Sequence, residues 1–434
     1  MRHPFDWPWI EEQVARSIDL WNGVSSAPPR EESVYTQREQ EKREQAYDRA
    51  LKEVEREARR ASRMCTDRRR VEERLIASFA RFAAVALGLE EDAIELLTRG
   101  FLPLGMQFAR WSRRFDPRLG MDDIVQACRN TWTACGLQPL LGERMELTPS
   151  IVGYSMLYPY SDNYLDGEGA DAEEKLRFSR RFLARLRGDD LSPMNQREHA
   201  IWDLVALVES QYPRAEHSQV FDCMIAIHRA QEESIAQLKN GSPASDARVL
   251  AISCAKGGSS VLADACLCHG WLDREESEFA FDWGVLLQIG DDLQDVREDV
   301  RRGSRTLFTR AVADGAPLDA LTGRLLNMSD LVSDRMDRMP HGSAALKGLL
   351  RMSWRSLIVM AVAESQDFFS AGFAAEMEQR SPFRFGFLRA RQKRLAGRRG
   401  LYAELFRILI EPGEANATCA LLGLPGPASA EIVG

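Results

Sequence analysis

Residues 279–295 read FAFDWGVLLQIGDDLQD, an apolar helical stretch that ends in a cluster of carboxylates. Apolar side chains would cover most of the circumference of a helix here, so we expect it to lie inside a thick bundle of helices. Asp291 and Asp295 are four residues apart and share one face of such a helix, with Asp292 beside them. This acidic end of a buried helix is the first candidate for a functional site.

The helical pattern continues through most of the chain around this stretch. From about residue 71 to residue 411, apolar residues recur at spacings of three and four, as in Leu75, Phe79 and Phe82. Period-two alternation and hairpin turns are missing, and prolines stand where helix ends are expected. The sequence therefore predicts an all-α protein, one large bundle with helices of roughly 15 to 30 residues.

Four segments are expected along the chain. Residues 1–36 are predicted to form an irregular N-terminal arm, because prolines interrupt regular structure. Residues 37–74 are densely charged without Gly or Pro, and form either a solvated helix or a linker. Residues 75–411 hold the helical domain, and residues 412–434, rich in Gly, Ala and Pro, are expected to form a flexible tail.

Composition excludes several classes of protein. The 434 residues carry 57 Lys and Arg against 65 Asp and Glu, a formal net charge of -8, which argues against nucleic acid as a partner. No apolar run approaches the roughly 20 residues needed to span a bilayer. The first residues lack the apolar core of a secretory signal, and eight cysteines in this length predict reduced thiols. A soluble, cytoplasmic protein is expected.

A second acidic pair follows another apolar stretch. Residues 154–166 read YSMLYPYSDNYLD, in which Asp162 and Asp166 are again four residues apart. Such pairs are common on solvated helix faces, but here each cluster ends an apolar segment. Two such helices facing each other would hold five carboxylates around one space, and hard divalent cations such as Mg²⁺ are the usual partners of such clustered anions.

A resemblance to a known family rests on the string QIGDDLQDVREDVRRGSRT, which begins at residue 288. It resembles the second aspartate-rich motif of the class I isoprenoid synthases, the superfamily of trans-prenyltransferases and terpene synthases. The residues that match the family's Gln-x-x-Asp-Asp-x-x-Asp pattern one by one are Gln288, Asp291, Asp292 and Asp295. The 129 residues from Asp162 to Asp291 also fit the separation of the family's two metal-binding helices. The resemblance covers roughly residues 75–380.

The resemblance implies a helical bundle of the isoprenoid synthase type with a central apolar cavity. It also implies three Mg²⁺ ions that bind the diphosphate of an allylic isoprenoid. The catalytic and metal-binding residues expected on this basis are Asp162, Asp166, Asp291 and Asp295, with Asp292 as a further metal ligand. The residues expected to bind the substrate are Lys256, Arg302, Arg305, Arg229, Gln288, Tyr158 and Tyr154.

Two adjacent glycines follow Lys256 inside an otherwise helical run. Gly257 and Gly258 together cost roughly 2 kcal/mol in a helix interior relative to alanine, so a packing or functional reason is expected. One interpretation is a break in the helix that exposes backbone groups to the cavity and resembles the broken central helix of terpene synthases. The other is a close crossing of two helices.

Departures from the family pattern favour one reaction. Asn163 stands where chain-elongating prenyltransferases have a second aspartate, and the signatures that bind their homoallylic co-substrate are not found. The mixture of motifs resembles the bacterial large-terpene synthases. We therefore expect a Mg²⁺-dependent terpene synthase, a lyase that ionises one prenyl diphosphate and cyclises or deprotonates the cation. The alternatives are a chain-elongating or head-to-head prenyltransferase, and a non-catalytic helical protein that binds an isoprenoid or acts as a scaffold.

Two further features leave alternatives open. The basic run at residues 384–399 would either touch an anionic membrane surface or form a solvated helix face. A homodimer stays open as well. Cys254, Cys266 and Cys268 are expected to be buried apolar thiols, because positions two apart on a helix cannot meet one zinc ion. Aromatic residues near the acidic clusters would either line a cavity or pack in the core.

Overall fold

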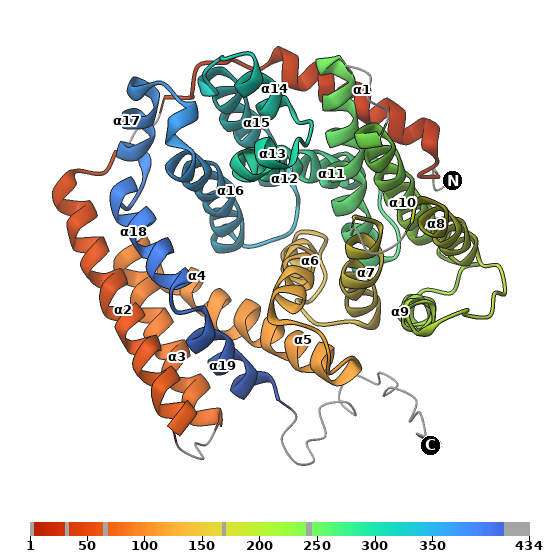
Figure 1. The fold of residues 1–434 in the computed structure, drawn as a ribbon, viewed down its shortest axis with the longest axis horizontal. Coiled ribbons are helices and arrows are strands. Elements are labelled where there is room, and N and C mark those ends of the chain that lie inside the picture. The colour runs from red at the N-terminus through yellow and green to blue at the C-terminus, as the bar shows by residue number, and fades with distance from the viewer. Residues whose placement is uncertain (1–3, 31–33, 64–67, 167–170, 240–244, 412–434) are drawn as a thin grey trace.

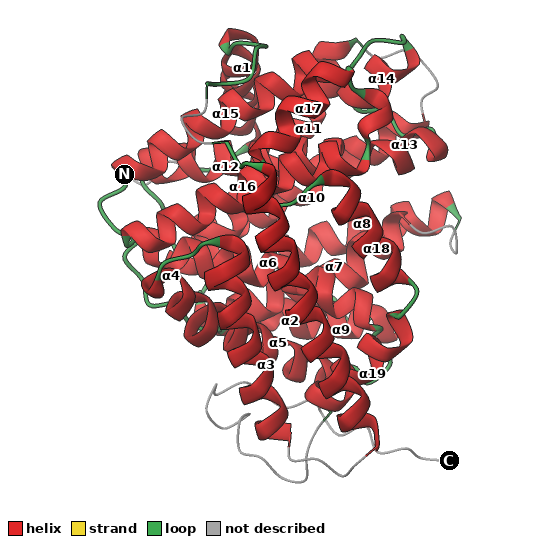
Figure 2. Ribbon diagram, turned by 90° about the vertical axis from the view of Figure 1, so that its left-hand side faces the viewer, coloured by secondary structure: helices red, strands yellow, loops and turns green. Residues whose placement is uncertain are grey.

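The protein is described here by a computed structural model, which covers residues 4–30, 34–63, 68–166, 171–239 and 245–411. Within these ranges the chain forms helices joined by loops, without a strand (Figure 2). The all-α class expected from the apolar periodicity is thus confirmed. The expected flexible tail at residues 412–434 lies outside the described residues.

The helices in chain order are α1 (Trp7–Gly23), α2 (Gln37–Arg63), α3 (Arg68–Phe82), α4 (Glu91–Glu95), α5 (Leu102–Phe115), α6 (Met121–Leu140), α7 (Pro149–Asp166), α8 (Ala172–Arg187), α9 (Gln196–Gln211), α10 (Ser218–Lys239), α11 (Asp246–His269), α12 (Arg274–Gln294), α13 (Val296–Arg302), α14 (Leu307–Ala313), α15 (Asp319–Arg338), α16 (Ala344–Glu364), α17 (Ala371–Arg380), α18 (Phe385–Ala396) and α19 (Arg399–Ile410). Two π-helical turns (Ala83–Leu87 and Leu96–Phe101) and one 3₁₀ turn (Gln366–Phe368) lie between them.

Helix α11 forms the centre of the bundle, where it packs against α12, α10, α6 and α1 (Figure 1). Ser245 caps its first turn, and Gly270, with a φ of 83°, ends it. By length and hydropathy alone, α11 is the one described helix that could cross a bilayer, and 78% of that stretch is buried inside the protein. Its apolar character is thus accounted for by neighbouring helices.

The glycine pair lies where α11 crosses α12. Helix α11 is continuous through Gly257 and Gly258, so of the two interpretations the helix break is excluded and the close crossing is confirmed. A Cβ atom on Gly257 would lie 2.4 Å from the Gly284 carbonyl oxygen, and one on Gly258 would lie 2.4 Å from the Phe281 ring. The glycines are required because the two backbones touch.

Within the N-terminal segment, Trp7–Gly23 form a helix where an irregular arm was expected, and the described residues on either side of it lack regular structure. Pro8 lies in the first turn of α1, where proline is tolerated because the amide hydrogen it lacks would have no helical partner. The Asp6 carboxylate accepts a hydrogen bond from the Trp9 amide at 3.1 Å and so caps the helix. Arg16 then joins α1 to the core through the fully buried Asp282, at 2.7 Å.

The charged segment at residues 37–74 forms α2 and the start of α3. Helix α2 lies along one side of the molecule, next to α18 and α19 (Figure 1). Ion pairs join its acidic side chains to the basic run at residues 384–399. They pair Glu41 and Glu44 with Arg384, Asp48 with Arg391, and Glu55 with Arg394 and Arg398. Four arginines of the basic run are thus paired with carboxylates of α2.

Candidate functional site at the end of helix α12

The start of α12 is fixed by a reciprocal cap. The Asp273 carboxylate accepts from the Glu276 amide at 2.8 Å, and the Glu276 carboxylate accepts from the Asp273 amide at 2.9 Å. From there α12 runs through the core, where Phe279, Phe281 and Trp283 are almost fully buried. These aromatics pack as core residues.

The acidic end of α12 reaches the surface. The Asp295 amide donates to the Asp291 carbonyl oxygen at 2.8 Å, so the two residues are one helical turn apart, as the spacing predicts. Asp295 is exposed, and the Asp291 side chain is 45% exposed. Burial raises the pKa of the Asp291 carboxyl, Arg129 and Lys256 act against this, and Asp295 adds to it. A cation bound between these two neighbouring carboxylates would be stabilised by both negative charges.

Asp292 points to the inner side of this cluster. One of its carboxylate oxygens accepts from the Ser253 hydroxyl at 2.8 Å, and the other accepts from the Gln288 side-chain amide at 2.9 Å. Burial raises the pKa of Asp292 to about 6, although these hydrogen bonds and Lys256 oppose the shift. Ser253 of α11 and Gln288 of α12 thereby hold the Asp292 carboxylate in place.

Two cations from other helices face the cluster. Arg129 of α6 places Nη2 3.4 Å from Asp291 Oδ1. Lys256 of α11 is half-buried, and its charge opposes the rise in pKa of both Asp291 and Asp292. The site therefore combines carboxylates, which suit a divalent cation, with cations, which suit an anionic substrate group.

Helix α6 also connects this cluster to α7, which carries the first acidic pair. The Gln126 side-chain amide donates to the Tyr158 hydroxyl at 2.7 Å, one turn along α6 from Arg129. A buried hydrogen bond between Thr131 and Ser155, at 3.1 Å, joins the same two helices further in. These two contacts hold α7 against α6 up to Tyr158, one helical turn before the first residue of the acidic pair.

The backbone of α7 extends to Asp166, as predicted, but the side chains of Asp162 and Asp166 lie outside the described part of the structure. Within the described residues, no group of three or more His, Cys, Asp or Glu side chains is arranged to hold a metal ion. The carboxylates of α12 nevertheless fit Mg²⁺, which prefers oxygen ligands. The exposed Asp295 carboxylate accepts no hydrogen bond from a described residue, so its oxygens remain available to a metal ion. The site that joins both acidic pairs stays a prediction.

Only some of the predicted substrate-binding residues lie at the acidic end of α12. Lys256 and Gln288 lie at the α12 cluster. Burial raises the pKa of the Asp295 carboxyl and Glu298 adds to the rise, while Arg129 and Arg302 oppose it. Arg302 itself pairs with Glu298 at 2.5 Å. Tyr158 faces α6 and Tyr154 is buried further along α7. Arg305 is half-buried after α13. Arg229 is half-buried on α10, and no described hydrogen bond or ion pair joins it to the α12 aspartates.

Three polar residues of the site carry no signal in the sequence. Arg129, Gln126 and Ser253 contact Asp291, Tyr158 and Asp292, respectively. None belongs to a motif, and the three-residue spacing of Gln126 and Arg129 is too common to signal a function. The cysteines behave as expected, since Cys254, Cys266 and Cys268 are buried.

Comparisons of the chain with protein-family models, with curated proteins and with solved structures found no match.

Proposed function

We propose that the chain is a Mg²⁺-dependent terpene synthase of the class I isoprenoid synthase type. It ionises one prenyl diphosphate, cyclises or deprotonates the carbocation, and releases diphosphate. In this proposal the isoprenoid tail occupies a central apolar cavity of the bundle. The observation that carries it is the meeting of the Asp291, Asp292 and Asp295 carboxylates with Lys256 and Arg129, from two other helices, at the end of a buried helix.

Each part of the site has a role in this reaction. Asp291 and Asp295, together with Asp162 and Asp166, would hold Mg²⁺, and Asp292 would keep its place through Ser253 and Gln288. Bound Mg²⁺ supplies Lewis acidity that neutralises charge on the leaving diphosphate.

The two cations act on the substrate directly. Lys256 and Arg129 bind diphosphate oxygens, and their positive charge stabilises the anion that develops as the carbon–oxygen bond breaks. Because the electron pair of that bond leaves with the diphosphate, a cation remains on the isoprenoid, and the apolar core protects it from water.

A product assay tests the proposal. Purified protein is incubated with Mg²⁺ and, separately, with C10, C15, C20 and C25 prenyl diphosphates, and both inorganic diphosphate and hexane-extractable product are measured. Hydrocarbon or terpene alcohol of unchanged carbon number supports the proposal. Asp295→Asn serves as the inactive control.

The other outcomes would overturn it in defined ways. Product of increased carbon number that forms only with added isopentenyl diphosphate indicates chain elongation. Product of doubled carbon number indicates head-to-head coupling. No release of diphosphate from any of the four substrates indicates a binding or scaffold protein.

A further inference from the structure

Helix α18 has two faces with different partners. Arg391 and Arg394 face α2, where each pairs with an acidic side chain at 2.5 Å and 2.8 Å, respectively. Arg389 and Lys393 are one turn apart and lie on another face of the helix. Both are exposed, and within the described residues no carboxylate forms an ion pair with either one. The two charged helices therefore leave two cations of α18 unmatched.

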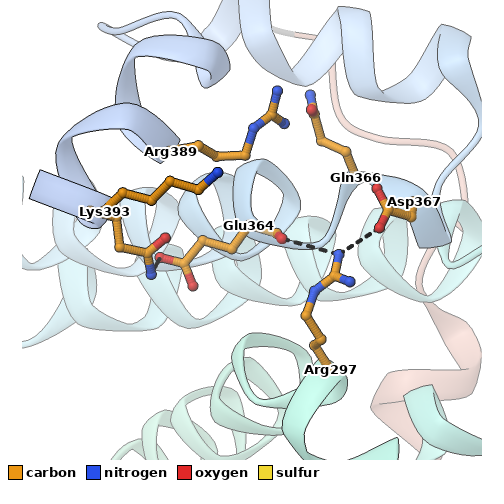
Figure 3. Close-up of a pocket in the computed structure, with 7 residues that line it drawn as sticks. Arg297, Glu364, Gln366, Asp367, Arg389 and Lys393 are labelled. Atoms are coloured by element: carbon orange, nitrogen blue, oxygen red, sulfur yellow. Dashed lines mark hydrogen bonds and ion pairs between the residues drawn. The ribbon is translucent and has the colours of Figure 1, made fainter. Parts of the chain in front are cut away.

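These two cations line a pocket of about 510 Å³ between α13, α18 and the end of α16. Figure 3 shows Arg389 and Lys393 entering it from α18, and Arg297 entering it from α13. The pocket is many times larger than the roughly 30 Å³ that one water molecule occupies in the liquid. It can therefore hold a small polyatomic ligand.

Two of the remaining lining residues, Glu364 and Asp367, hold Arg297 in place. Its guanidinium donates to the Glu364 carbonyl oxygen at 3.3 Å and to the Asp367 carboxylate at 2.9 Å (Figure 3). The Glu364 carboxylate accepts from the Gln392 side-chain amide at 3.1 Å. Three cations against two carboxylates leave an excess of one positive charge. The surplus comes from α18, where Arg389 donates, among the described residues, only to the Ala363 carbonyl oxygen, at 3.5 Å, and the side-chain amide of Gln366 lines the same pocket.

We propose that this pocket binds a phosphate-bearing ligand, which Arg389, Lys393 and Arg297 hold by charge-assisted hydrogen bonds. An arginine presents several donors in one plane, a lysine presents a compact charge, and phosphate groups are recognised by this combination. The ligand is either a free phosphate or diphosphate ion or the phosphate of a lipid headgroup. The proposal goes beyond the proposed reaction and does not depend on it, because the pocket residues are not the metal-binding aspartates.

Calorimetry with inorganic diphosphate, in EDTA and without any prenyl substrate, tests the free-ion source. The unaltered protein should bind, and Arg389→Ala/Lys393→Ala should bind at least about tenfold more weakly, because two charged donors are lost. The exchange variant Arg389→Lys/Lys393→Arg keeps both charges and should retain most of the affinity. Arg49→Ala/Lys52→Ala removes one arginine and one lysine from the exposed side of α2 and should leave the affinity for diphosphate unchanged.

Vesicle flotation tests the lipid source. Phosphatidylcholine vesicles with and without phosphatidate are compared for the unaltered protein and the same three variants. Binding to phosphatidate vesicles alone, lost in Arg389→Ala/Lys393→Ala, assigns the pocket to a headgroup. The proposal is overturned if neither ligand binds, or if the α18 variant and the α2 variant lose affinity equally. Asp295→Asn, which alters no residue that lines the pocket, should still bind diphosphate in EDTA, so loss of the proposed reaction and loss of this binding can be told apart.

Discussion

Arg129 is the residue that brings a third helix to the acidic cluster. It contacts Asp291 from α6, and both side chains remain about half exposed, at 54% and 45%. A partly exposed ion pair contributes little to stability. We therefore expect Arg129 to contribute to catalysis rather than to stability, because its guanidinium can bind the leaving group.

We predict that Arg129→Ala lowers the rate of diphosphate release roughly ten- to a hundredfold, because one charged donor to the leaving group is lost. The free energy of unfolding should change little. Arg99→Ala, which removes another exposed and ion-paired arginine, is the matched control. Unchanged turnover in Arg129→Ala would show that this residue does not face the substrate.

Asp264 provides a test of burial at a single residue. It is 2% exposed on α11, and burial raises the pKa of its carboxyl well above the usual value. Because the folded protein holds this proton more tightly than the unfolded chain, the resulting stability is present at low pH. It is lost as pH rises toward the raised pKa.

We predict that Asp264→Asn gains stability relative to the unaltered protein as pH rises from 5 to 8. The difference should grow by up to about 1.4 kcal/mol per pH unit, since the unfolded aspartate is ionised over this range while the folded one keeps its proton, and asparagine has no such proton to lose. Urea unfolding at several pH values measures it. The exposed Asp190→Asn should follow the unaltered protein, and parallel curves for Asp264→Asn would contradict the prediction.

At this scale, the sequence predicted the spacing of Asp291 and Asp295, because helical periodicity alone determines which residues share a face. It also predicted Gln288 and Lys256 at the site. It did not predict Ser253 or Arg129. Their contacts depend on how α11 and α6 pack against α12, and this packing is a tertiary property that no local pattern encodes.

At the scale of elements, the crossing of α11 and α12 sets the geometry of the site. A Cβ atom on Gly284 would lie 2.0 Å from the Gly257 carbonyl oxygen, which no side-chain adjustment can relieve. The same close approach lets Ser253 of α11 reach Asp292 of α12. The sequence indicated that the glycine pair had a purpose, but both a break and a crossing were compatible with it. Gly284, the residue on α12 that the glycine pair contacts, lies on the next helix. The sequence alone therefore does not show that the two helices cross there.

We predict that Gly284→Ala destabilises the protein by about 1–3 kcal/mol or more, because the two helices must separate. Gly348→Ala on α16 is the matched control, since no neighbouring atom lies within 4 Å of the added methyl group. That control should be neutral or stabilising by up to about 1 kcal/mol. Equal stabilities of the two variants in urea would contradict the close crossing.

At the scale of the whole molecule, α1 is part of the bundle. Arg16 and Arg335 both contact the fully buried Asp282, at 2.7 Å and 2.6 Å, and so join α1 and α15 to α12. Trp9 packs edge-on against Phe281, with ring centroids 6.0 Å apart. The sequence did not predict this helix, because its prolines were interpreted as breakers and the buried partner, Asp282, is more than 250 residues away.

We predict that Arg16→Ala lowers the free energy of unfolding by about 1–3 kcal/mol, because Asp282 loses two of its charged hydrogen bonds in the core. Arg335 remains, so the protein should still fold. Denaturant unfolding followed by circular dichroism measures the change, with the exposed Arg38→Ala as control. Identical midpoints for Arg16→Ala and Arg38→Ala would show that α1 is not held through this contact.

The central claim is that the aspartates of α7 and α12 bind divalent metal together. Titration with Mn²⁺, followed by electron paramagnetic resonance of the free ion, tests it most directly. We predict that Asp162→Asn/Asp166→Asn and Asp291→Asn/Asp295→Asn each abolish tight binding, and that Asp189→Asn/Asp190→Asn, the same charge change at exposed positions, preserves it. Undiminished Mn²⁺ binding after replacement of the α7 pair would contradict the shared metal site.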